Sequence, residues 1–123
     1  MKPLLPVVKA ALLAASLLAF GGTASAGGDA KRGEALYKVY CTQCHGVKGD
    51  GKGVNAAHMA VMPRDHTDAK EMSARTDEEL FKVVKLGGKS INKSVLMPAW
   101  GRNLADEDIH ALVAHLRSLC CKQ

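Results

Sequence analysis

Aromatic side chains are scarce in this sequence. They make up 4% of its 123 residues, and beyond residue 26 only Tyr37, Tyr40, Phe81 and Trp100 remain. Long hydrophobic runs are missing too, because the apolar run Ala10–Phe20 has 11 residues and a membrane-spanning helix needs roughly 20. A domain of this size with so few aromatic residues has little apolar mass of its own for a core.

Other signals are absent as well. The sequence has no strand pattern, no internal repeat and no low-complexity tract, so we expect an all-α domain. Its formal net charge of +5 includes Lys2 and Lys9, which leaves about +3 beyond residue 26. That is not the charge balance of a nucleic-acid-binding protein, and we expect no nucleic-acid partner.

The first 26 residues have the pattern of a secretory signal peptide. Two lysines supply positive charge, an apolar run follows, and Ala24-Ser25-Ala26 is a small-residue cleavage site. The alternative is an uncleaved anchor, which the shortness of the run disfavours. Cleavage after Ala26 would leave residues 27–123 as one small exported domain with no membrane span.

Three helices are expected in the exported part. Asp29–Tyr40 has an N-cap aspartate and apolar residues at helical spacing. Thr76 and Glu79 form a capping box that opens a second helix, and a third starts near Asp106 with acidic residues in its first turn. The segment Asn55–Lys70 is expected to be mostly irregular. The apolar face of the third helix is formed by Ile109, Leu112, Val113, Leu116 and Leu119.

The stretch Cys41-Thr42-Gln43-Cys44-His45 is the most informative in the chain. C-x-x-C-H is the attachment signature of haem c. Two thiols three residues apart on a helical turn can reach the two vinyl groups along one edge of a porphyrin, and the histidine that follows can then present its imidazole to the iron. The pentapeptide alone also fits a redox dithiol or half of a zinc site.

The order of these features resembles a class I c-type cytochrome, of the small bacterial monohaem kind, over nearly all of residues 28–119. The shared order is a helix, C-x-x-C-H, a glycine-rich loop, a helix, a Met-Pro loop and an amphipathic C-terminal helix. The resemblance implies an all-α cytochrome c fold for residues 27–123, in which three main helices and their loops wrap one haem bound covalently through Cys41 and Cys44. It also implies that Gly33 and Tyr37 pack against the last helix, where His115 stands in place of the usual aromatic residue.

The resemblance further implies two iron ligands. His45 would be the proximal ligand, and Met97, which precedes Pro98 in a loop between two helices, matches the setting of the family's axial methionine. A thioether favours ferrous iron and so raises the reduction potential. The alternatives for the sixth ligand are Met59, Met62, His58 and His66, whereas we expect only surface or packing roles for Met72, His110 and His115.

Three further residues are expected at the haem. Pro63 aligns with the family proline whose carbonyl accepts the proton on His45 Nδ1, a bond that would fix the imidazole tautomer. Arg64 and Trp100 are candidates to bond the haem propionates. Their alternatives are a solvated arginine and a core tryptophan.

Cys120 and Cys121 have no counterpart in the family pattern. As the rival to haem, they could complete a zinc site or a disulfide with Cys41 and Cys44, but a vicinal pair is awkward for either. A disulfide between neighbours is strained, so we do not expect them to join each other. Free thiols, an inter-subunit disulfide and a lipidation or cross-linking point remain open. A monomer is expected, with a disulfide-linked dimer through Cys120 or Cys121 as the alternative.

With both axial positions taken, a substrate has no place at the iron, so we expect no enzyme. The predicted function is a diffusible one-electron carrier in the periplasm, serving redox proteins whose acidic docking surfaces would be steered by Lys48, Lys52, Lys89 and Lys93, unless these lysines only solubilise the surface. One alternative is a cytochrome subunit fixed to a periplasmic dehydrogenase or terminal oxidase. The other is a haem protein with a labile sixth ligand that binds small molecules.

Overall fold

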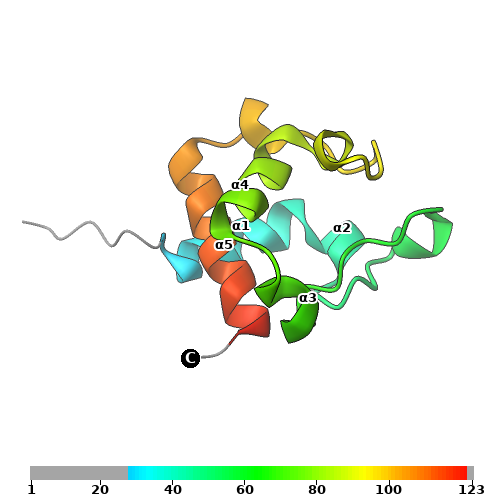
Figure 1. Cartoon of the computed structure of the whole chain (residues 1–123), viewed down its shortest axis with the longest axis horizontal. Coiled ribbons are helices and arrows are strands. Elements are labelled where there is room, and N and C mark those ends of the chain that lie inside the picture. The colour runs from blue at the N-terminus through cyan, green and yellow to red at the C-terminus, as the bar shows by residue number, and fades with distance from the viewer. Residues whose placement is uncertain (1–27, 122–123) are drawn as a thin grey trace, which may run out of the picture.

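The computed structural model describes residues 28–121, and the predicted signal peptide, residues 1–26, lies outside the described part. The described residues form helices and loops with no strand, which confirms the all-α prediction (Figure 1). The helices are α1 (Ala30–Tyr40), α2 (Thr42–His45), α3 (Ala69–Ser73), α4 (Asp77–Leu86) and α5 (Asp106–Cys120). Three short 3-10 turns lie between them: η1 (Ala56–His58), η2 (Gly88–Ile91) and η3 (Trp100–Arg102). Over residues 28–121, no helix is long and apolar enough to cross a membrane.

Helix α1 crosses α5 at a point where the two backbones touch (Figure 1). A Cβ atom on Gly33 would overlap the carbonyl group of Ala111 in α5, so only glycine fits there. One turn further along α1, Tyr37 is buried, and its ring centroid lies 5.0 Å from that of the buried His115. The predicted packing of Gly33 and Tyr37 against the last helix is therefore confirmed, with His115 in the aromatic position.

The core lies between the three longer helices. Arg117 of α5 adds polar ties, because its guanidinium donates to the carbonyl oxygens of Met72 and Arg75 at 2.7 and 2.5 Å and to the Asp77 carboxylate at 2.7 Å. These bonds hold the end of α3 against the start of α4. The buried apolar core consists of Tyr37, Met72, Leu80, Val84, Leu104, Ile109, Leu112, Val113 and Leu116.

Two helix starts illustrate what local sequence can specify. Thr76 and Glu79 make the predicted capping box, each side chain bonding the other's backbone N–H at 3.1 and 2.7 Å. The segment Asn55–Lys70 was expected to be mostly irregular, and this holds except for the short turn η1 and the last two residues. Helix α3 begins at Ala69, where Asp68 acts as the N-cap.

The two C-terminal cysteines are joined to each other by a disulfide bond. The expectation that such a bond would not form was wrong. Helix α5 ends at Cys120, and Cys121 has left the helical conformation, with φ −127° and ψ 56°, so the two sulfur atoms can meet. Because both sulfur atoms are already bonded, neither residue is a free thiol, and a dimer linked through Cys120 or Cys121 would first require this bond to be broken.

We expect His115→Phe to reduce the acid sensitivity of the fold. Burial lowers the pKa of His115 from its ordinary 6.5, so the unfolded chain binds this proton more readily than the folded chain. The free energy of unfolding should therefore fall as the pH drops below 6.5. Phenylalanine keeps a ring against Tyr37 and removes the proton. Urea unfolding at several pH values should show a shallower loss in the variant.

The control for this experiment is His58→Phe. His58 is exposed and lies outside the core, so its replacement tests whether a change in the profile requires the loss of a buried histidine. Identical profiles for His115→Phe and the parent protein would contradict the prediction.

Candidate functional site

A cavity of about 490 Å³ lies beside the crossing of α1 and α5. Its wall combines four helices with parts of two loops, residues 59–66 and 88–100, which extend to the same side of the helices (Figure 1). The volume falls in the range of roughly 300–1,000 Å³ that is usual for cofactor pockets. All seven predicted site residues line this one cavity: Cys41, Cys44, His45, Pro63, Arg64, Met97 and Trp100.

The C-x-x-C-H stretch folds as a helical turn directly after α1. The backbone N–H groups of Cys44 and His45 donate to the carbonyl of Cys41 at 3.2 and 2.9 Å. The glycine-rich loop then folds back onto this turn, and the N–H of Gly53 donates to the Cys44 carbonyl at 3.0 Å. A Cβ atom on Gly53 would overlap the Gln43 carbonyl. The loop thus satisfies carbonyl groups that the end of α2 would otherwise leave without partners.

Cys41 and Cys44 are free, half-buried thiols. Burial, with a smaller contribution from Cys44, raises the pKa of the Cys41 thiol to about 12, so it stays protonated near neutral pH. Because Cys120 and Cys121 are bonded to each other, they are not available to Cys41 and Cys44 for a disulfide or a zinc site. In the part of the chain that the structure describes, no group of three His, Cys, Asp or Glu side chains is placed to hold a metal ion.

The imidazole of His45 is held by a backbone carbonyl. Its Nδ1 lies 3.0 Å from the carbonyl oxygen of Arg64. The prediction that Pro63 supplies this acceptor was wrong by one residue, because the Pro63 carbonyl lies against Gly51 instead. A carbonyl can only accept, so Nδ1 carries the proton and Nε2 keeps its lone pair. Burial lowers the pKa of His45 and favours this neutral form, which is the form that binds metals.

His66 is a buried residue whose position the sequence did not reveal. Its ring stacks on that of His45, with centroids 4.3 Å apart and planes 19° from parallel. On its other side, Nδ1 is hydrogen-bonded to the Tyr37 hydroxyl at 3.0 Å. Burial, with a smaller effect of His45, lowers the pKa of His66 to about 3, so the ring is neutral. His66 therefore lies beside His45 rather than across the cavity from it, which does not suit an alternative sixth ligand.

The Met97 loop is held by the two glycines that end α4. The N–H of Gly88 donates to the Met97 carbonyl at 3.1 Å, and a Cβ atom on Gly87 would come within 2.8 Å of the same oxygen. Gly87 also has φ +82°, which favours glycine. The half-buried Met97 side chain is thereby kept in the cavity wall. Met59 and Met62 line the cavity as well, although Met62 is 61% exposed.

Arg64 and Trp100 occupy different surroundings in the wall. The Arg64 guanidinium forms an ion pair with Glu71 at 2.6 Å, which leaves its remaining N–H groups for another acceptor. Trp100 packs against Tyr40, with ring centroids 5.1 Å apart. Arg64 is half-buried, and Trp100 is half-buried and packed against the core, as the alternative of a core tryptophan expects. The roles of both residues at the haem propionates stay predictions.

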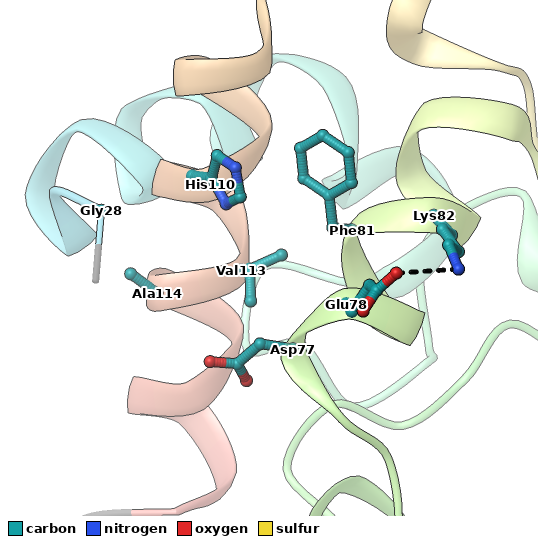
Figure 2. A pocket seen from close by; sticks show the side chains of 8 residues that line it. All are labelled: Gly28, Asp77, Glu78, Phe81, Lys82, His110, Val113 and Ala114. Atoms are coloured by element: carbon teal, nitrogen blue, oxygen red, sulfur yellow. Dashed lines mark ion pairs between the residues drawn. The ribbon is translucent and has the colours of Figure 1, made fainter. Parts of the chain in front are cut away.

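The remaining methionine and histidine candidates do not line the cavity. Met72 is fully buried in the core and His58 is exposed. His110 stacks on Phe81 at 4.5 Å between α4 and α5, in a second cavity of about 410 Å³ (Figure 2). The other side chains of that cavity include the ion pair of Lys82 with Glu78, and it holds none of the predicted site residues (Figure 2).

The donor set of the main cavity suits a covalently held haem. Two free thiols, a neutral imidazole and a thioether line it together, and these are the groups that attach and ligate haem in c-type cytochromes. The rest of the wall is largely apolar, as an iron porphyrin needs. Its aliphatic members are Val61, Leu80, Val83, Val84, Ile91, Leu96, Leu112 and Leu116.

Known proteins resemble this chain over most of its length. Residues 28–116 match the sequence model of the family described as "Cytochrome C oxidase, cbb3-type, subunit III". The chain is 33% identical over 112 residues to "Cytochrome c-553" of Helicobacter pylori (strain J99 / ATCC 700824), a match that covers 91% of this chain and 99% of that protein.

Solved structures resemble it in fold as well. The "KustC0563 c-type cytochrome" superposes with a TM-score of 0.58 at 26% identity, over 72% of this chain and 96% of that one. A chain of the "Kuenenia stuttgartiensis reducing HAO-like protein complex Kustc0457/Kustc0458" gives a TM-score of 0.59 at 28% identity. That match covers 73% of this chain but 42% of the other, so this chain resembles only a part of it.

Proposed function

Because this chain belongs to the c-type cytochromes and is a small monohaem, electron-carrying haem c protein, we propose that it works as a one-electron carrier in the periplasm. Its haem is held covalently by Cys41 and Cys44 and ligated by His45 and Met97. The signal-peptide pattern of residues 1–26 supports the periplasmic location.

The convergence of four side chains on one apolar cavity carries this proposal. Cys41, Cys44 and His45 come from a single helical turn, whereas Met97 comes from a loop more than fifty residues later in the chain. A helical turn alone would be found for any C-x-x-C stretch, whatever its role. The added methionine, held in the same wall by the glycines after α4, is what a structural dithiol would not need.

Different residues of the chain would attach the haem, ligate its iron and exclude water. Haem, when bound, supplies an iron that takes up and releases one electron. Cys41 and Cys44 would hold the haem through two thioether bonds, and the Arg64 carbonyl would keep the imidazole of His45 in place through its Nδ1. His45 and Met97 would supply the two iron ligands, which would leave a substrate no place to coordinate. The apolar wall limits the entry of water, so little rearrangement accompanies a change of charge.

The proposal is tested by the pigment of the purified, exported protein. We expect a coloured protein that keeps its pigment in acidified organic solvent and has a low-spin ferric spectrum with the weak far-red band of sulfur-ligated iron. The Cys41→Ser/Cys44→Ser double variant should release or fail to acquire the pigment. A colourless parent protein would contradict haem binding. A high-spin spectrum that changes readily with carbon monoxide would instead support a labile sixth ligand.

Met97→Ala should abolish the far-red band and lower the reduction potential. The thioether favours ferrous iron, so its loss shifts the balance toward the ferric form. Met62→Ala is the matched control, because Met62 also lines the cavity and is a methionine of the other loop. Redox titration followed by optical spectroscopy measures both quantities. Loss of the band in Met62→Ala and not in Met97→Ala would assign the ligand to Met62.

We further propose that the carrier's redox partners present acidic surfaces. Lys93 lines the cavity and is exposed. Lys89 on the same loop is also exposed, and so are Lys48 and Lys52 on the glycine-rich loop. The rate of electron transfer to a partner should fall as salt is added, and Lys93→Glu should lower the rate at low salt more than Lys31→Glu, on the exposed face of α1, does. A flat salt response with equal effects of both variants would remove this role.

A second candidate function is that of a subunit fixed to a larger redox enzyme. The description of the matching family as an oxidase subunit favours it, and so does the resemblance to part of a chain in an enzyme complex. In size-exclusion chromatography at several salt concentrations, a fixed subunit would co-elute with its enzyme at each of them, whereas a diffusible carrier would elute alone.

A further inference from the structure

We infer that His66, anchored by Tyr37, is a positioning residue that sets the orientation of the His45 imidazole. This inference rests on the proposed role of His45 as an iron ligand. It assigns a function to a buried histidine that neither binds the iron nor belongs to the apolar core.

The segment that contains Arg64 and His66 contacts His45 twice. The Arg64 carbonyl bonds the Nδ1 edge of the imidazole at 3.0 Å, and the His66 ring covers one face at 4.3 Å. A single hydrogen bond fixes the tautomer and one edge but leaves the ring able to tilt about that contact. A flat ring stacked at 19° restricts the tilt, so the two contacts together define the plane of the imidazole.

His66 itself is held from two directions. Its backbone N–H donates to the Gly49 carbonyl at 2.6 Å, which ties the segment to the loop that folds back on α2. Its Nδ1 is bonded to the hydroxyl of Tyr37, which burial keeps protonated by raising its pKa. Among the residues described by the structure, this is the one hydrogen bond that the hydroxyl makes, so it ties the His66 ring to Tyr37. The position of the stacked ring therefore derives from α1, the same helix that leads into Cys41.

An alternative explanation is that His66 only fills space. Against it, an aliphatic residue would fill the same volume without needing a polar partner, and a buried polar group left unpaired is destabilising. A histidine that is hydrogen-bonded to a hydroxyl and stacked on a second imidazole is suited to orient that imidazole rather than only to fill space. The test must therefore separate an effect on His45 from an effect on stability.

Two substitutions separate the hydrogen bond of His66 to Tyr37 from its stacking on His45. His66→Gln keeps an acceptor for Tyr37 and removes the stacked ring, whereas His66→Phe keeps a stacked ring and removes the acceptor. In the haem-loaded ferric protein, we expect His66→Gln to change the g-values of the electron paramagnetic resonance spectrum and the pattern of paramagnetically shifted haem methyl signals, because both depend on the plane of the axial imidazole. His66→Phe should largely restore the parent pattern, and Tyr37→Phe should give a change of the same kind but smaller.

Two control variants test whether a general loss of packing, or of any stacked histidine, changes the spectra. Met72→Ala removes a fully buried core side chain outside the cavity wall, so it should lower the unfolding temperature and leave the spectra unchanged. His110→Gln removes another stacked histidine, the one on Phe81 (Figure 2), and should leave the spectra unchanged too.

The outcomes separate this inference from the proposed function. If His66→Gln and Tyr37→Phe keep the parent's g-values and methyl pattern and only lower stability as Met72→Ala does, His66 is a packing residue and the inference is overturned. Should His66→Gln not fold, an unchanged spectrum of Tyr37→Phe overturns it alone. A parent protein without haem would overturn the proposed function and this inference together.

Discussion

The close approach of α1 to α5 at Gly33 is the constraint on which the rest of the structure depends. Glycine allows the backbone of α1 to lie against the Ala111 carbonyl, and this contact fixes the direction in which α1 runs. Helix α1 ends at Tyr40, directly before Cys41, so its direction also fixes where the C-x-x-C-H turn begins. A side chain at residue 33 would push the two helices apart and would displace the turn that carries both thiols and His45.

Tyr37 links the core of the protein to its site. One side of the residue packs on His115 in α5, and its hydroxyl bonds His66, which covers His45. The chain of contacts from the helix crossing to the imidazole thus contains only two residues. Because Tyr37, His66 and His115 are buried, water does not weaken the contacts between them, and the position of His45 follows the position of α1.

The sequence predicted those parts of the structure that local spacing determines. The capping box at Thr76, the apolar stripe of α5 and the helical turn at Cys41 each depend on residues a few positions apart, and each was found where expected. The shared cavity of Cys41 and Met97 was predicted through a family resemblance, because no local rule relates positions so distant. Their roles at the haem stay predictions.

What the sequence did not reveal depends on contacts between segments. The acceptor for His45 Nδ1 is the Arg64 carbonyl rather than that of Pro63, a difference of one residue in a loop without periodicity. The stacking of His66 has no sequence signal, because a lone histidine in an irregular segment is equally consistent with a surface residue. The Cys120–Cys121 bond depends on where α5 stops, and helix ends are uncertain by a residue or two from sequence alone.

The scarcity of aromatic residues has a structural counterpart in how the histidines are used. Among residues 28–121, His115 packs on Tyr37, His66 stacks on His45 and His110 stacks on Phe81, so three histidines stand where larger aromatic rings would serve for packing alone. An imidazole ring contributes less apolar surface than phenylalanine, but it adds a polar atom that can be directed at a neighbour. That exchange suits a protein whose missing apolar mass would be supplied by a porphyrin. A haem in the cavity would fill it, and the rings around it would then be free to orient the proposed ligand His45.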